Sequence, residues 1–386
     1  MELRPAYIVA ARRTALGRVG GLHKSRRVDD LAAPIVAAAL KDAGLTPDQV
    51  DDVIVGNCTA GANPARLIAL TAGLPEAVSA MTVDQQCASG LEAILAAIRK
   101  IATADAEAAV AGGAEALSTA PWRVARPRNP HQTPHFIGFD ANGGDATHDM
   151  HAFEMSERLA RQLGISRAQQ DAFALKSHLR ASRAQEARRF VGEIVPLRAD
   201  REEARDQSAV ELDLADLERL KPFLPPDGTH TPGNTSSAHD GAAMVVVVSE
   251  GVWRLLGSPP ALRFVASATL GVGPDEDMRS PIAAMKKLES RMMGLDRAEI
   301  GLVEMSEASA AQAIALAQAL DIDEGVINSD GGALVRGHPL GAAGAVLVTR
   351  LFSRMVRAGG GDSPRYGAAT VGAIGGLGIA ALFERV

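Results

Sequence analysis

Residues 81–100, MTVDQQCASGLEAILAAIRK, decide the fold, because they predict a strand, a tight turn and an Ala-rich helix. The same order returns at residues 325–352, GVINSDGGALVRGHPLGAAGAVLVTRLF. Each copy follows a predicted helix, a second helix start and a buried strand, at residues 30–57 and 280–308. Each copy also closes on a strand with a small-residue loop. We therefore interpret the chain as one supersecondary unit written twice.

Helices that alternate with apolar strands predict an α/β fold, with mixed or mostly parallel sheets covered by helices on both faces. We expect the two copies to pack face to face about a pseudo-twofold axis. Residues 118–239 break the pattern and predict an inserted loop region, which on such scaffolds commonly holds a substrate. The predicted domains are an N-terminal half at 1–117 with 240–257, the insertion at 118–239, and a C-terminal half at 258–386.

The composition bounds the class of protein. The chain has 386 residues, of which 47% are hydrophobic and 3% aromatic, enough for a large aliphatic core. A net charge of -6 offers no general attraction for nucleic acid or an anionic membrane. There is no apolar run of signal-peptide or membrane-spanning length, so we expect a cytoplasmic protein. The two cysteines, Cys58 and Cys87, are too few for a metal cluster or a disulfide framework.

Cys87 is the first candidate site residue. It follows a predicted strand and opens a helix, where unpaired backbone N–H groups and the helix dipole favour a thiolate. The small residues Ala88, Ser89 and Gly90 leave room for a ligand to approach. The alternative is that Cys87 is a small core residue, as free cysteines often are. Cys58 ends a strand with no such turn after it, and we interpret it as structural.

His338 is the second candidate, in the Gly-rich turn Gly337-His338-Pro339. This turn takes the place in the second copy that Cys87 takes in the first, so a pseudo-twofold axis would bring the two side chains together. A Cys–His pair suits nucleophilic acyl transfer, because the imidazole takes the thiol proton. The alternative is an ordinary solvated loop histidine. The segment GLGIA at 376–380 could offer backbone N–H groups to an oxyanion, or could simply pack tightly.

Together these segments resemble the thiolase family over essentially the whole chain. CASGLEA at 87–93 is similar to the family's nucleophile motif, and GGALVRGHPLGAAG at 331–344 to its Gly-His-Pro motif. AGGAEALS at 111–118 and DGTHTPGNTSSAHDGAA at 227–243 also match stretches typical of the family. The resemblance implies a five-layered αβαβα fold with a loop domain, assembled as a homodimer or a homotetramer.

The resemblance also implies an activity. In thiolases an acyl-coenzyme A or 3-ketoacyl-coenzyme A acylates the cysteine, and Claisen chemistry then joins the acyl group to an acceptor. Coenzyme A would be a substrate here and not a permanently bound cofactor. Carried over residue by residue, Cys87 would be the acylated nucleophile, with its N–H helping to bind the thioester oxygen. His338 would be the activating base, and Ser236 would contact the pantetheine of coenzyme A.

Two departures from the family stand in the motifs of the second half. Thiolases usually carry a second cysteine, the acid/base, in a C-terminal Cys-x-Gly-x-Gly loop; here that position falls on Gly372, two residues before Ile374. The family's Asn-Glu-Ala-Phe motif reads SEAS, with Ser306 in place of the Asn that stabilises the enolate. Acylation of Cys87 should survive these changes. The carbon–carbon step lacks its usual acid/base, which typically contributes about 10²–10⁴-fold.

Three candidates could replace that acid/base, namely Glu307, His239, and His148 with His151 nearby. Each could equally be a structural or solvated residue.

Three functions stay open from the sequence. The first is a thiolase-like acyltransferase, degradative or biosynthetic, in fatty acid metabolism. The second transfers the acyl group to a self-activated acceptor such as a phenol, as the catalytic subunit of a complex with partner subunits. The third is a scaffold that binds acyl-CoA without turnover. Retention of both Cys87 and His338 argues against the third.

Overall fold

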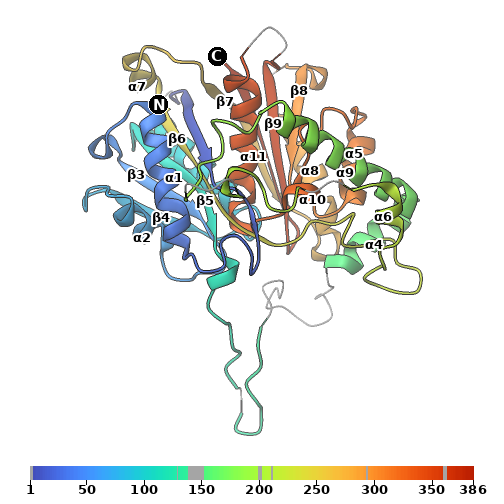
Figure 1. The fold of residues 1–386 in the computed structure, drawn as a ribbon. Coiled ribbons are helices and arrows are strands. Elements are labelled where there is room, and N and C mark those ends of the chain that lie inside the picture. The colour runs from blue at the N-terminus through green and yellow to red at the C-terminus, as the bar shows by residue number, and fades with distance from the viewer. Residues whose placement is uncertain are drawn as a thin grey trace.

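The computed structural model describes residues 3–127, 129–137, 152–198, 202–209, 212–292, 294–359 and 363–386. Within them, the strands form a ten-stranded sheet in the order β4-β3-β5-β6-β1-β7-β10-β9-β8, with β2 paired to β6 off this path. Figure 1 shows the two halves of this sheet beside each other. The strands are β1 (Ala6–Arg13), β2 (Gly17–Arg18), β3 (Asp52–Gly56), β4 (Ser79–Val83), β5 (Ala108–Glu115), β6 (His239–Ser249), β7 (Leu262–Gly271), β8 (Ile300–Met305), β9 (Tyr366–Ala373) and β10 (Leu377–Arg385).

The sheet is mixed, as the sequence predicts. Strand β3 pairs in parallel with β4 and β5, and β8 pairs in parallel with β9. The remaining pairs, including β5 with β6 and β9 with β10, are antiparallel. The halves meet at a short antiparallel pairing of β1 with β7, where Tyr7 faces Arg263 and Ile8 faces Leu262.

Three buried clusters define the layers. Side chains alternate along a strand, so Ile379, Ala381 and Phe383 of β10 face one cluster while Ala380 and Leu382 face another. The first cluster contains helices α3 (Ser89–Ala102) and α11 (Ala343–Phe352) with strands of both halves, so these helices form a central layer. Outside them, α1 (Val28–Ala43) and α2 (Pro64–Thr71) cover the first half. Helices α8 (Ser280–Glu289) and α9 (Ala310–Leu320) cover the second. The predicted αβαβα architecture is confirmed.

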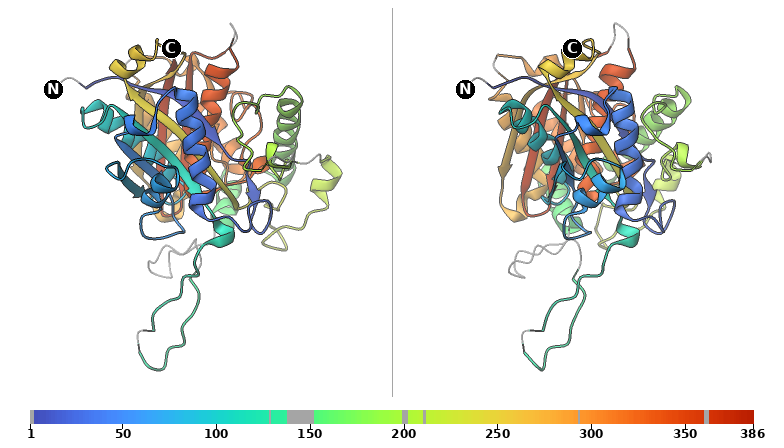
Figure 2. Two further views of the ribbon diagram at one scale, coloured as in Figure 1. Left: turned by 60° about the vertical axis from the view of Figure 1, so that its left-hand side comes forward. Right: turned by 90° about the vertical axis from the view of Figure 1, so that its left-hand side faces the viewer.

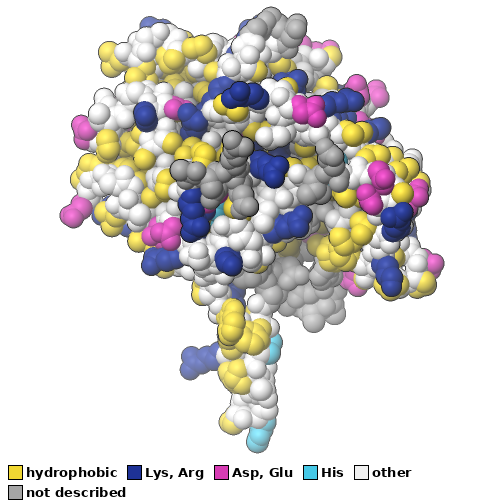
Figure 3. All heavy atoms as spheres, viewed as in Figure 1, with side chains coloured by type: hydrophobic (Ala, Val, Ile, Leu, Met, Phe, Trp, Pro, Cys, Tyr) yellow, Lys and Arg dark blue, Asp and Glu magenta, His cyan; other side chains and the backbone are white. Residues whose placement is uncertain are grey.

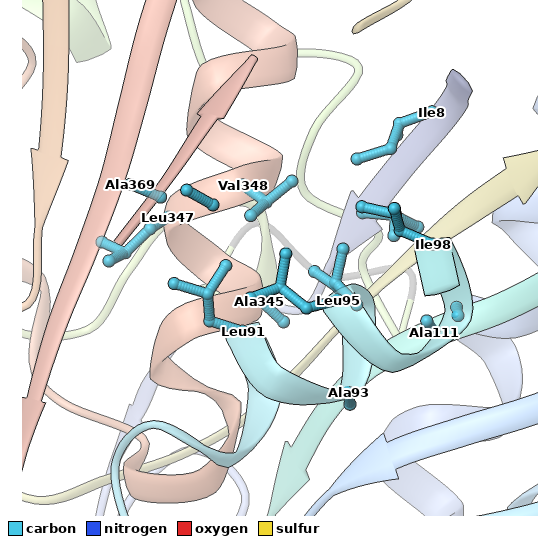
Figure 4. Packing of buried hydrophobic residues seen from close by; sticks show 14 of the residues in the cluster. Ile8, Leu91, Ala93, Leu95, Ile98, Ala111, Ala345, Leu347, Val348 and Ala369 are labelled. Carbon is cyan, nitrogen blue, oxygen red and sulfur yellow. The ribbon is translucent and has the colours of Figure 1, made fainter. Parts of the chain in front are cut away.

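The central helices approach each other reciprocally. A Cβ on Gly90 of α3 would lie 2.7 Å from the Gly341 carbonyl oxygen and 3.0 Å from the Ala345 nitrogen. A Cβ on Gly344 of α11 would lie 2.5 Å from the Leu91 nitrogen. Figure 4 shows the resulting packing, with Leu91 next to Ala345 where the helices meet. The reciprocal contact brings together the turns that precede both helices.

The described part of residues 118–239 contains an extended arm, residues 120–127 and 129–137, and three α-helices. The arm projects away from the layers (Figure 2) and carries exposed Trp122 and Phe136, whose rings stack edge to face. Hydrophobic side chains are visible along it in Figure 3. Helices α4 (Ala152–Leu163) and α5 (Arg167–Glu186) pack on α9, and α6 (Leu214–Glu218) packs on α5.

The remaining α-helices of the described residues are short: α7 (Glu250–Leu255) and α10 (Ala333–Arg336). Of the helices described, none is both long and apolar enough to cross a bilayer.

Candidate active site

A cavity of about 330 Å³ is lined by residues from both halves and from the insertion. Most of the residues chosen from the sequence reach it: Cys87, His338, Ser236, Ser306, Gly372 and Ile374. The two repeats thus place their equivalent turns on one cavity, as the repeat argument predicts.

Cys87 sits on a strained turn between β4 and α3. The preceding residue, Gln86, has a φ of 54°, a left-handed conformation that costs energy for a residue with a side chain. Ser89 stabilises this turn, because its hydroxyl donates to the Gln86 carbonyl at 2.5 Å and accepts from the Gln85 N–H at 2.8 Å. The turn aims the sulfur into the cavity while leaving the side chain 9% exposed.

The Cys87 thiol is not poised as a thiolate. Its pKa is raised to about 12, mainly by burial and in smaller part by the negative charges of Glu115 and Asp277, against the lowering effect of its own backbone N–H. The thiolate expected from a helix N-terminus is therefore outweighed by desolvation in the folded chain. A nucleophilic role for this sulfur would therefore need a base that takes its proton.

His338 is suited to be that base. Burial lowers its pKa to about 4, with a further contribution from His239, so the ring is neutral near pH 7. Its backbone is fixed between two hydrogen bonds, since its N–H donates to Ser237 and its carbonyl accepts from His239. Its Nδ1 lies 3.2 Å from the Ser306 hydroxyl. When Nδ1–H donates to that hydroxyl, Nε2 is free to accept a proton.

The far side of the cavity is formed by the end of β9, the turn after it and the residue after β8. Gly372 lies near the end of β9, and Ile374 lies in the turn between β9 and β10. Ser306 directly follows β8, and its N–H donates to the Thr370 carbonyl at 3.1 Å. A Cβ on Gly372 would lie 2.8 Å from Pro281 Cδ and from the Ser280 hydroxyl. The start of α8 therefore fills the space that a side chain at position 372 would need.

Two family models match this chain, the thiolase N-terminal domain over residues 6–251 and the thiolase C-terminal domain over residues 258–385. The chain belongs to the thiolase family. It is 37% identical to an acetyl-CoA acetyltransferase of Allochromatium vinosum, covering 98% of each protein. It is 36% identical to an acetyl-CoA acetyltransferase of Shinella zoogloeoides, covering 98% of this chain and 99% of that protein. A crystal structure of the Bacillus anthracis acetyl-CoA acetyltransferase superposes with a TM-score of 0.92, at 33% identity and full coverage of both chains.

Glu307 of this thiolase-family chain does not reach the cavity. Its carboxylate accepts a hydrogen bond from the Leu334 N–H at 3.2 Å, and burial raises its pKa. Glu307 therefore contacts α10, and it is not among the residues that line the cavity. From the sequence, Glu307 is a candidate acid/base. The structure does not place its carboxylate at the cavity.

His239 does not line the cavity either. The His239 ring is buried, with Nδ1 at 2.9 Å from the Ser237 carbonyl and Nε2 at 2.6 Å from the Ser208 hydroxyl. The Cys58 thiol donates to Glu115 at 3.0 Å and does not line the cavity, in line with a structural role. His148 and His151 lie outside the described residues.

Among the cavity residues that the sequence reasoning missed, one is acidic. Asp277 lies in the short 3₁₀ helix Pro274–Arg279, is 2% exposed and lines the cavity. Its segment reads PDED, in which Asp275 and Glu276 lie nearer the surface. Nothing in three consecutive acidic residues indicates which of them is buried.

Proposed function

We propose that this protein is an acyltransferase that receives an acyl group on Cys87 from an acyl-CoA or a 3-ketoacyl-CoA. The acyl group then passes to coenzyme A or to a carbon acceptor. The single observation that carries the proposal is that Cys87 and a neutral His338, from equivalent turns of the two repeats, line one cavity. Relatives named acetyl-CoA acetyltransferases, similar over nearly their whole length, support it.

The chemistry follows from the protonation states. His338 Nε2 accepts the thiol proton as the Cys87 sulfur attacks the thioester carbonyl. The oxyanion that forms is stabilised by backbone N–H groups at the cavity, those of Cys87 and of the turn containing Ile374. Coenzyme A then leaves with the proton from the imidazolium, and the acyl group stays on Cys87. The reverse sequence returns the acyl group to coenzyme A.

We also propose that the chain departs from the family at the acid/base. Of the described residues that line the cavity, Cys87 is the only cysteine, and Gly372 has no side chain to contribute. Coenzyme A is proposed as a substrate that passes Ser236, and a homodimer or homotetramer in the cytoplasm as the working form. No specific observation favours a phenolic acceptor, dedicated partner subunits or a purely binding role.

The test is the intact mass of the protein after incubation with acetyl-CoA and with longer acyl-CoAs. An acyl adduct should form on the wild type and on Cys58→Ser, the matched control that alters the other cysteine. The adduct should be absent from Cys87→Ala. Formation of the same adduct on Cys87→Ala, or no adduct with any donor, would refute the proposal.

A further inference from the structure

Asp277 is the one acidic side chain among the residues that line the cavity in the described part of the chain. Its backbone is anchored, because its carbonyl accepts from the Ser280 hydroxyl at 2.6 Å and the next carbonyl, of Met278, accepts from Gln312 at 3.1 Å. Within the described residues, neither of its carboxylate oxygens has a hydrogen bond of standard geometry. A buried carboxylate without well-formed hydrogen bonds is costly, and such a group at a cavity indicates a use that involves a ligand.

The position of Asp277 matches the chemistry that the family motif lacks here. Gly372 stands where a thiolase cysteine is expected, and its side-chain direction points at Ser280 and Pro281, three and four residues after Asp277. The Asp277 carboxylate also lies near the N–H of Gly375 in the β9–β10 turn. One segment thus fills the space beside Gly372 and brings an acidic group to the same side of the cavity.

We propose that Asp277 is the general acid/base of the carbon–carbon step, in place of a second cysteine. This inference rests on the proposed acyl-Cys87 chemistry. In the cleavage direction, Cys87 attacks the 3-keto carbonyl and the bond between C2 and C3 breaks. The electron pair goes to C2 as an enolate, and protonated Asp277 gives its proton to C2, which releases acetyl-CoA. In the condensation direction, the Asp277 carboxylate removes a C2 proton and the resulting enolate forms the new bond as the sulfur leaves.

The surroundings give Asp277 a suitable pKa. Its pKa is raised to about 7, mainly by burial and also by the charge of Asp275, while the backbone N–H groups of Met278 and Gly375 partly offset the rise. A group with a pKa near the working pH serves in both directions, since both protonation states are populated. The charged or titratable groups that face it are Cys87 and His338 across the cavity and Asp275 on its own helix, which pairs with Arg158 of α4.

The experiment compares two routes to the same acyl-enzyme by single-turnover mass measurement. Acyl-CoA acylates Cys87 without breaking a carbon–carbon bond, whereas a 3-ketoacyl-CoA must break one. Asp277→Asn should keep the first rate and lose about 10²–10⁴-fold of the second. Glu276→Gln, which removes an exposed charge from the same turn, should keep both rates. Asp277→Glu should recover part of the cleavage rate.

The pH profile is a second readout that a merely structural role would not change. Wild-type cleavage needs the protonated acid, so its rate should fall as pH rises through about 7. Acylation from acyl-CoA should not show this fall, and Asp277→Asn should lack it.

Two results would overturn the inference while leaving the proposed function intact. One is equal cleavage by Asp277→Asn and wild type, and the other is wild-type acylation from acyl-CoA with no cleavage of any 3-ketoacyl-CoA. Failure of wild-type acylation from both donors would instead remove the proposed function.

Discussion

The two walls of the cavity differ in origin. One wall, which we call the nucleophile wall after the role we propose for Cys87, consists of Cys87 and His338. These residues come from equivalent turns of the two repeats, each ahead of a central helix. The other wall, which we call the acceptor wall after the role we propose for it, consists of Gly372 near the end of β9, Ile374 in the turn that follows, and Asp277 in a short 3₁₀ helix. These segments have no repeat relation to each other. The comparison teaches that a repeat fixes one pair of groups through the packing of two helices. The acceptor wall needs only one acid/base side chain that faces the cavity, and this side chain can come from different segments of the chain.

The largest expected effect lies on the nucleophile wall. His338→Ala should slow acylation by acyl-CoA by about 10²–10⁴-fold, because nothing else on that wall takes the thiol proton. Time-resolved intact mass gives the rate. His135→Ala, which changes an exposed histidine on the arm, is the control and should acylate normally. A His338→Ala rate close to that of the wild type would mean that His338 does not take the proton of the Cys87 thiol.

The next largest effect should be in the pH dependence of the acylation rate, which should differ between the wild type and His338→Ala. With a His338 pKa of about 4 the ring stays neutral from pH 5 to 8, so the wild-type rate should be flat there. Without this base only the thiolate attacks, and its fraction rises about tenfold per pH unit below the thiol pKa. The same steep rise in wild type would show that His338 does not act as the base.

His338 also makes the free energy of unfolding depend on pH. Its folded pKa lies below its ordinary value of 6.5, so the unfolded chain binds the proton more readily. Its stabilising contribution is therefore present above about 6.5 and is lost as pH falls from there toward 4. Rate measurements below pH 5 need a check that the protein is still folded.

The same division explains what the sequence could predict. The meeting of Cys87 and His338 at one cavity could be predicted, because each residue is tied to a helix start inside a repeated pattern. The layers followed from the same periodicity. The raised pKa of Cys87 could not be predicted, because it comes from burial among groups distant in the chain. Ser306 and Glu307 are adjacent and only the first faces the cavity, a choice made by side-chain direction after β8. Asp277 is distinguished from its acidic neighbours by packing alone.

Gly90→Ala should break the contact that builds the nucleophile wall. Its new methyl group would meet the backbone at Gly341 and Ala345, so α3 would have to shift against α11. We expect a loss of about 1–3 kcal/mol in the free energy of unfolding, measured by urea denaturation. Gly271→Ala is the control, because a Cβ there meets nothing within 4 Å. Equal stability of the two variants would mean that the helix contact is looser than described.

Gly372→Ala should have a smaller effect on the acceptor wall. Its methyl group would meet side-chain atoms of Pro281 and Ser280, which can move more easily than backbone. We expect a loss of about 1 kcal/mol, below that of Gly90→Ala. The same urea experiment ranks the two. If Gly372→Ala were the more damaging change, the acceptor wall would be the more rigid of the two.

Ser306→Ala should give the smallest effect, because Ser306 acts on the nucleophile wall only through His338. Its hydroxyl lies 3.2 Å from Nδ1, and a hydrogen bond of this kind is worth about 0.5–1.5 kcal/mol, or about 3–10-fold in acylation rate. Ser306→Thr keeps a hydroxyl and should recover most of that loss. Since the neutral ring remains in Ser306→Ala, the rate should stay flat between pH 5 and 8, unlike in His338→Ala. A loss as large as that of His338→Ala would mean that Ser306 takes part in the proton transfer itself. No loss at all would mean that the backbone hydrogen bonds of His338 suffice to position its ring.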